Sequence, residues 1–131
     1  MASVIARGDD LLGKRFRLKR RKDYQSVYAR RDSVAAGTLV LYIRDNDNTG
    51  SPRVGFSVSK KIGGAVVRNR CRRLLSEAVR VRLSELRTGR DYVFVGRQAL
   101  ARADFAAVKR DVERTLRKKG CLPAPESGVN I

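Results

Sequence analysis

Hydrophobic residues recur along the chain with two spacings, and these separate predicted helices from predicted strands. Residues 23–31 place Tyr24, Val27 and Tyr28 on one side of a short helix, because side chains three and four positions apart share a helix face. Residues 66–86 and 104–118 show the same helical spacing over longer segments. The last helix is expected to begin at Asp104, a capping residue type, and to stop before Gly120.

Three other segments are rich in β-branched and aromatic residues, which favour strands. They are residues 38–44, 53–59 and 91–97. Turn-forming residues at 45–52 separate the first two, so we expect these two strands to pair as a hairpin. This order of helices and strands indicates an α+β domain, a small sheet with helices packed mainly on one face.

The periodic pattern fades at both ends of the chain. Residues 1–13 show no periodicity, and we predict a flexible N-terminal segment there. Residues 120–131 contain Pro and Gly and are expected to form a disordered tail. Residues 14–119 then make a single domain, as a length of 131 residues favours.

The amount and distribution of charge indicate that this small domain is a binding protein. Thirty Lys and Arg stand against thirteen Asp and Glu, a formal net charge of +17. Residues 14–31 hold nine cations and one acid, residues 60–82 hold eight and one, and residues 109–119 hold six and two. Concentrated blocks of this kind are typical of nucleic-acid binding. A merely solvated basic surface is the plainer alternative.

Neither membrane attachment nor catalysis by the chain itself is favoured. No apolar run approaches the ~20 residues needed to span a bilayer, and the N-terminus lacks a signal-peptide core. We therefore expect a cytoplasmic protein. Histidine, the commonest general base, is absent, and carboxylates do not cluster in the sequence. Cys71 and Cys121 match no disulfide or metal spacing. We expect no catalytic residue and no metal ligand in the protein.

The start of the long predicted helix is the strongest candidate site. Four arginines fall within residues 68–73, although the partial positive charge of a helix N-terminus disfavours cations. Helical spacing predicts that an apolar side faces the sheet, formed by Val67, Cys71, Leu74, Leu75, Ala78 and Val81. It predicts a polar outer arc of Asn69, Arg72, Arg73, Ser76 and Arg80, with Arg68 and Arg70 at its edges.

Arginine on this outer arc suits phosphate, because its planar fork can donate two parallel hydrogen bonds. Asn69 could contact a sugar or base edge, or cap its own helix. The preceding residues 60–64 could approach phosphate through their backbone. They are not a nucleotide-binding P-loop, because no Gly-Lys-Ser/Thr follows.

Aromatic residues suggest a second site. Tyr24 and Tyr28 lie one helical turn apart, beside the basic residues 14–22. Rings next to cations can stack on unpaired bases. Paired aromatics on a short helix also commonly pack into a core, and the pattern leaves both interpretations open. Tyr42, on a predicted strand, is equally ambiguous.

Residues 53–73, RVGFSVSKKIGGAVVRNRCRR, resemble the signature of the bacterial ribonuclease P protein subunit. The Arg-Asn-Arg core after Val-Ser-Lys-Lys-Ile-Gly is its specific part, and the similarity extends over about residues 17–118. The resemblance implies the order α-β-β-β-α-β-α, with a left-handed β-α-β crossover that the general handedness rule does not anticipate. The additional strand would come from dividing the region 33–44.

The function implied by this resemblance is endonucleolytic 5′ maturation of precursor tRNA, which leaves a 5′-phosphate. Catalysis would reside in a large RNA subunit that requires Mg²⁺. The protein would bind that catalytic RNA and the single-stranded 5′ leader of precursor tRNA, with no DNA or membrane partner. A structural RNA-binding protein, such as a ribosomal component, explains the charge but not the signature. An autonomous nuclease is disfavoured by the missing histidine and acid clusters.

The resemblance also assigns residues by position. Those matching the part of the signature that faces the catalytic RNA are Lys60, Lys61, Arg68, Asn69, Arg70, Arg72 and Arg73. Those matching the leader-binding cleft are Tyr24, Tyr28, Tyr42, Ser57, Ser59 and Arg97. Tyr24 and Tyr28 stand where the family often has phenylalanine, a change that keeps the stacking surface.

Overall fold

The computed structural model describes residues 16–46 and 50–123. Its helices and strands are α2 (Arg21–Ala29), β1 (Ser33–Ala35), β2 (Leu39–Asp45), β3 (Arg53–Ser57), α3 (Ala65–Arg80), β4 (Arg90–Gly96) and α4 (Phe105–Lys118). Two short 3₁₀ helices, η2 (Leu83–Glu85) and η3 (Gln98–Arg102), flank β4. The expected α+β class and element order are confirmed, including the division of the region 33–44 into two strands. The predicted flexible segment 1–13 lies outside the described residues.

The four strands form a mixed sheet in the order β1-β2-β4-β3. β4 pairs antiparallel with β2 and parallel with β3, so it lies between them. The predicted hairpin between residues 38–44 and 53–59 is therefore wrong. The physical reason is that the central position suits the strand that is buried on both faces, and β4 is buried continuously over residues 91–94.

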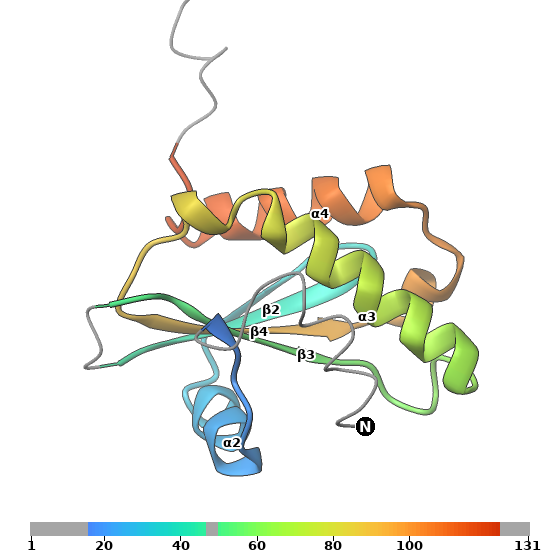
Figure 1. The fold of residues 1–131 in the computed structure, drawn as a ribbon, viewed down its shortest axis with the longest axis horizontal. Coiled ribbons are helices and arrows are strands. Elements are labelled where there is room, and N and C mark those ends of the chain that lie inside the picture. Colours follow the sequence, from blue (N-terminus) through green and yellow to red (C-terminus); the bar gives the residue numbers. More distant parts are fainter. Residues whose placement is uncertain (1–15, 47–49, 124–131) are drawn as a thin grey trace, which may run out of the picture.

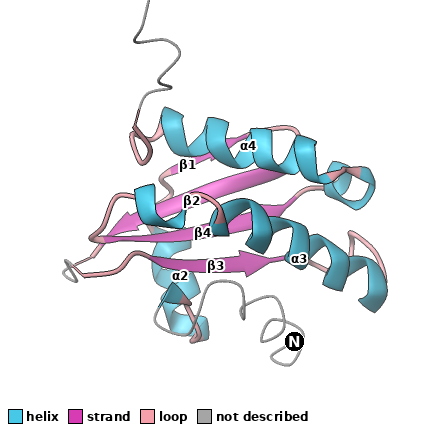
Figure 2. Ribbon diagram, turned by 45° about the horizontal axis from the view of Figure 1, so that its top comes forward, coloured by secondary structure: helices cyan, strands magenta, loops and turns pink. Residues whose placement is uncertain are grey.

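The connection from β3 through α3 to β4 has the unusual hand that the family resemblance implies. Figure 2 shows β3 and β4 pointing the same way, with α3 in front of the sheet. When the view of Figure 2 is turned so that β3 and β4 point upward, with α3 toward the viewer, β4 lies to the left of β3. This left-handed crossover departs from the rule that such connections are right-handed.

Helices cover both faces of the sheet, but unequally. α3 and α4 lie side by side on one face, and the short α2 lies alone on the other (Figure 1). Alternation along β2 sends Leu39, Leu41 and Ile43 into the main core under α3 and α4. A smaller core of Leu18, Val27 and Val93 lies under α2. The two faces thus present different surroundings to any ligand.

The long helix α3 is shorter than its hydrophobic spacing predicts, and the side of it that faces the sheet differs in part from the predicted one. It ends at Arg80, because the chain turns at Val81 into η2, and Val81 is exposed instead of facing the sheet. Val79 takes the inward position. Arg72 and Ser76 lie seven and three residues before Val79, on the same side of the helix, and are buried with it. Their predicted place on the outer arc is wrong.

The ordered domain also continues past the predicted boundary at residue 119. After α4, Gly120 adopts a φ of 70°, a left-handed conformation that ends the helix and turns the chain back. Cys121 then donates its backbone N–H to Leu116, and both Cys121 and Leu122 are buried in the main core. The predicted tail therefore begins too early, and residues 124–131 lie outside the described part.

The buried carboxylate of Asp91 links β2, β3 and β4 at one end of the sheet. The Asp91 side chain on β4 is fully buried and accepts hydrogen bonds from Arg44 on β2 and Arg53 on β3, at 2.9 Å for each donor nitrogen. Asn46 adds a further hydrogen bond. Two guanidinium groups thus compensate one buried charge, and three strands are joined by side chains in addition to their backbone ladders.

We expect replacement of Asp91 with alanine to lower the free energy of unfolding by about 3 kcal/mol, because two guanidinium groups would lose their buried partner. Urea denaturation of the wild-type and variant proteins measures the difference. The matched control is Asp45→Asn, which removes a carboxylate that is 71% exposed and pairs with Arg90. That change should cost less than about 1 kcal/mol. Equal effects of the two substitutions would contradict the role given to burial.

Candidate nucleic-acid interface

The residues predicted to bind the catalytic RNA gather where the chain leaves β3 and enters α3. Lys60 and Lys61 are exposed in the turn between these elements. The turn is closed by a hydrogen bond from the Ile62 backbone N–H to the Ser59 carbonyl, 3.0 Å, and the Ile62 side chain is buried. An apolar anchor thus holds a loop whose two lysines point to solvent.

Arg68 and Arg70 are tied to backbone carbonyls. Arg68 Nη1 donates to the Gly63 carbonyl at 2.8 Å, which fastens the loop to the first turn of α3. Arg70 donates to the carbonyls of Ala101 and Ala103, in the connection between β4 and α4. A carbonyl orients a guanidinium group without neutralising it. Both side chains therefore keep their full charge in a fixed position.

Among residues 16–46 and 50–123, no carboxylate forms an ion pair with Arg68, Arg70, Arg72 or Arg73. Glu77 is the acid within α3, and it pairs with Arg80 through two hydrogen bonds. Those hydrogen bonds lower the pKa of Glu77. The arginines at the start of α3 thus have no carboxylate partner within the described ranges, and Arg73 is exposed.

Arg72 differs from its neighbours because it is buried, with 4% of its surface exposed. Its Nη2 donates to the Asn69 side-chain oxygen at 3.4 Å, and its Nε and Nη1 have no hydrogen-bond partner within the described part of the chain. Burial and the nearby charge of Arg68 lower the pKa of Arg72. Asn69 does not cap α3, whose N-cap is Gly64, and instead orients Arg72.

The residues predicted to bind the 5′ leader lie mostly on the face of the sheet that α2 covers, opposite α3 and α4. The rings of Tyr28 on α2 and Tyr42 on β2 meet edge to face, with centroids 5.0 Å apart and planes 77° apart. A hydrogen bond joins Tyr28 to Ser57 on β3, and burial raises the pKa of the Tyr28 phenol although this hydrogen bond opposes the rise. Three elements thus converge on one aromatic cluster.

Tyr24 lies against the backbone of β3 at Gly55. A Cβ added at Gly55 would come within 2.6 Å of the Tyr24 ring, so only glycine allows this approach. Beneath the rings, Val93 is paired in register with both Tyr42 and Gly55 and is fully buried. The tyrosines form the partly exposed rim of the small core. Their packing against a core is confirmed, and stacking on unpaired bases stays a prediction.

Ser59 and Arg97 lie at one end of this face. Ser57 is paired with Val95 in the parallel ladder, so two residues further on Ser59 and Arg97 leave the sheet at the same edge. Both are exposed. Arg97 donates to the Ala36 carbonyl at 2.7 Å, which holds its side chain across the end of β2.

A basic hollow beside α2 was not assigned from the sequence. It has a volume of about 390 Å³ and is lined by Arg17, Lys19, Arg20, Asp23 and Arg53. The residues before α2 run along the edge of β3, where Leu18 donates its N–H to the Val54 carbonyl at 2.9 Å. The basic run was visible in the sequence. Its meeting with Arg53 depends on this strand-edge contact, which has no local signal.

The described ranges contain no group of three or more His, Cys, Asp or Glu side chains placed to hold a metal ion. Within the same ranges, no helix has the length and apolar character needed to cross a membrane.

Comparisons with known proteins point to one family. The family model described as Ribonuclease P matches residues 12–120. A Ribonuclease P protein component from Clostridium botulinum is 37% identical over 120 residues, covering 87% of this chain and 96% of the relative. The protein of the same name from Gluconacetobacter diazotrophicus is 46% identical over 105 residues, covering 79% and 90%.

Solved structures agree with the sequence relatives. An RNase P protein from Staphylococcus aureus, a mutant with defective mRNA degradation activity, superposes with a TM-score of 0.78 at 31% identity, covering 87% of this chain and 96% of that one. The RNase P protein from Thermotoga maritima gives a TM-score of 0.70 at 27% identity, covering 78% and 96%.

The close approach at Gly55 allows a test of the aromatic cluster. Replacing Gly55 with alanine should displace the Tyr24 ring, because the new methyl group would overlap it. NMR spectra should then show altered Tyr24 ring resonances. The matched control is Gly37→Ala, whose added carbon would meet Asp111 at an ordinary 3.7 Å. Unchanged Tyr24 resonances in the Gly55 variant would contradict the packing described.

Proposed function

The chain belongs to the bacterial ribonuclease P protein family, and we propose that it is the protein subunit of a ribonuclease that matures the 5′ ends of precursor tRNA. One observation supports this proposal above others: two candidate RNA-binding sites of different character lie on opposite faces of one sheet. The arginine-rich start of α3 belongs to one face. The tyrosine cluster under α2 belongs to the other.

In this proposal the start of α3 docks on the catalytic RNA. Lys60, Lys61 and Arg73 are exposed, and Arg68 and Arg70 are held by carbonyls that leave their charge uncompensated. Release of counterions from RNA phosphates then supplies much of the affinity. Arg72 and Asn69 act beneath this surface, where Asn69 accepts a hydrogen bond from the buried guanidinium group.

The aromatic face then receives the single-stranded 5′ leader. Stacking requires an unpaired base, because bases in a duplex already have both faces covered. Tyr24, Tyr28 and Tyr42 are each only partly buried, and the basic hollow whose lining includes Arg17, Lys19 and Arg20 lies beside α2. Rings next to cations favour an extended strand, whose bases and phosphates are both accessible.

The same proposal assigns bond cleavage to the RNA subunit, an endonuclease activity that requires Mg²⁺, and places the protein in the bacterial cytoplasm. This chain contributes binding and orientation. Its side chains on the two faces would hold the catalytic RNA and the leader at once, which favours a precursor over a mature tRNA that lacks the leader.

Reconstitution tests the proposal. Purified protein should restore cleavage of precursor tRNA by a bacterial ribonuclease P RNA at salt concentrations where the RNA alone is inactive. The protein without RNA, supplied with Mg²⁺, is the control for an autonomous nuclease and should not cleave. A basic RNA-binding protein of similar charge is the control for nonspecific stimulation. If this chain stimulates no more than that protein does, a ribosomal or other structural role would be favoured instead.

A second experiment addresses the leader. Replacing both Tyr24 and Tyr28 with leucine should weaken binding of precursor tRNA by the reconstituted enzyme by about tenfold or more, since each stacked base contributes ~1–3 kcal/mol. Mature tRNA should bind as before. The matched control replaces both residues with phenylalanine, which keeps the rings. Equal weakening of precursor and mature tRNA would show that the cluster does not hold the leader.

A further inference from the structure

α4 carries a third basic surface, separate from the two sites above. A hollow of about 610 Å³ runs along this helix and is lined by Ala106, Lys109, Arg110, Glu113, Arg114, Arg117 and Lys118. These residues recur at intervals of three and four, so they form one stripe along the helix. The opposite side of α4, with Val108, Val112 and Leu116, is buried in the main core. We refer to the lining residues as the α4 stripe.

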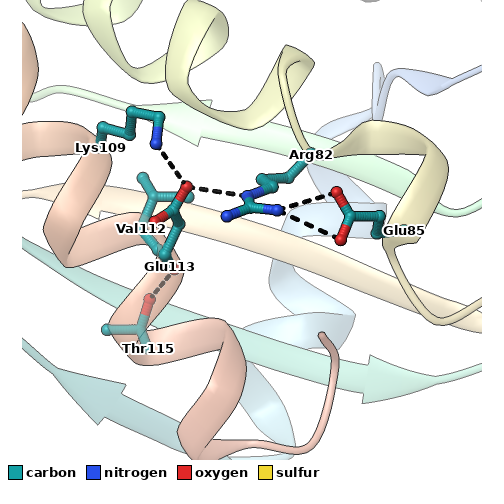
Figure 3. A network of polar contacts seen from close by, with 6 residues as sticks. All are labelled: Arg82, Glu85, Lys109, Val112, Glu113 and Thr115. Carbon is teal, nitrogen blue, oxygen red and sulfur yellow. Dashed lines mark hydrogen bonds and ion pairs between the residues drawn. The ribbon is translucent and has the colours of Figure 1, made fainter. Parts of the chain in front are cut away.

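The one carboxylate in the α4 stripe is already engaged. Figure 3 shows Glu113 shared between Lys109 of the same helix and Arg82, which follows α3, at 2.9 and 2.8 Å. Arg82 also holds Glu85. Burial acts to raise the pKa of Glu113, but hydrogen bonds from Arg82 and Lys109 lower it overall. Glu113 therefore has no capacity left to neutralise the remaining cations of the stripe.

Arg110, Arg114 and Lys118 form a row of like charges at intervals of four residues, and all three are exposed. Asp111 forms a long ion pair with Arg110 through Oδ1, at 3.6 Å, while its buried Oδ2 accepts hydrogen bonds from Thr38. No described carboxylate forms an ion pair with Arg114 or Lys118. Like charges at this spacing destabilise a helix. The helix dipole favours Lys118 in the last turn, but not Arg110 near the start. Folding alone does not account for the row.

We propose that the α4 stripe binds the sugar-phosphate backbone of the catalytic RNA, at a segment distinct from the one bound at the start of α3. The proposal rests on the proposed function. The catalytic RNA is the partner because α3 and α4 lie side by side on one face of the sheet (Figure 1), whereas the tyrosine cluster lies with α2 on the other. A large folded RNA docked on α3 extends over that same face. The cationic row then meets phosphates, and its self-repulsion is relieved on binding.

The test replaces Arg110, Arg114 and Lys118 with glutamine and measures binding to ribonuclease P RNA without tRNA. We expect affinity to fall about tenfold to a hundredfold near 0.1 M salt. The negative slope of log affinity against log salt concentration should become shallower by about two. A second variant, Arg110→Lys with Arg114→Lys, keeps the charges and should keep the slope. In hydroxyl-radical footprinting, the triple glutamine variant should lose protection of some RNA nucleotides. Those nucleotides should differ from the ones that lose protection in Arg73→Gln, a variant at the start of α3.

The matched control removes three exposed cations from α2, by Arg21→Gln, Lys22→Gln and Arg30→Gln. It should leave the salt slope nearly unchanged. An equal loss in both triple variants would overturn the proposal in favour of a net-charge effect. An unchanged slope in the α4 variant, or loss of the same footprint as Arg73→Gln, would overturn a separate α4 contact. If the wild-type protein does not bind ribonuclease P RNA, the proposed function itself fails, together with this inference.

Discussion

Burial of β4 on both faces is the constraint on which the rest of the structure depends. Tyr92 and Phe94 point into the core beneath α3 and α4, while Val93 points into the small core beneath α2. Because β4 must lie between β2 and β3, the chain crosses over from β3 through α3 to reach it. This crossover places the arginine-rich start of α3 at one end of the helical face. The tyrosine cluster is thereby left on the opposite face.

The two faces stabilise their polar groups in different ways, and the difference bears on function. Asp91 draws Arg44 and Arg53 into a closed network, so those arginines serve the fold. At the start of α3, Arg68 and Arg70 bond only to carbonyls among their described partners, and their charge remains. Arginine is thus neutralised by a carboxylate where it joins strands. It keeps its charge at the start of α3, where a polyanion would dock.

The aromatic face combines packing with accessibility. A core of three buried residues is small, and the tyrosines around it complete its packing while keeping part of each ring exposed. Gly55 lets Tyr24 approach the sheet, and Ser57 holds the Tyr28 hydroxyl. Rings fixed in this way lose little freedom when a base stacks on them, which is an advantage for binding a flexible single strand.

The sequence by itself determined the types of the elements, the apolar side of α2 and the Asp104 cap of α4, because these depend on residues a few positions apart. Its signature also identified the family and the arginine cluster. Only the tertiary structure decided that β4 separates β2 from β3, that Arg72 turns inward with Val79, and that Arg53 meets both Asp91 and the basic run before α2. Those outcomes join segments far apart in the chain. They follow from which strand is best buried on both sides, a comparison that local spacing does not contain.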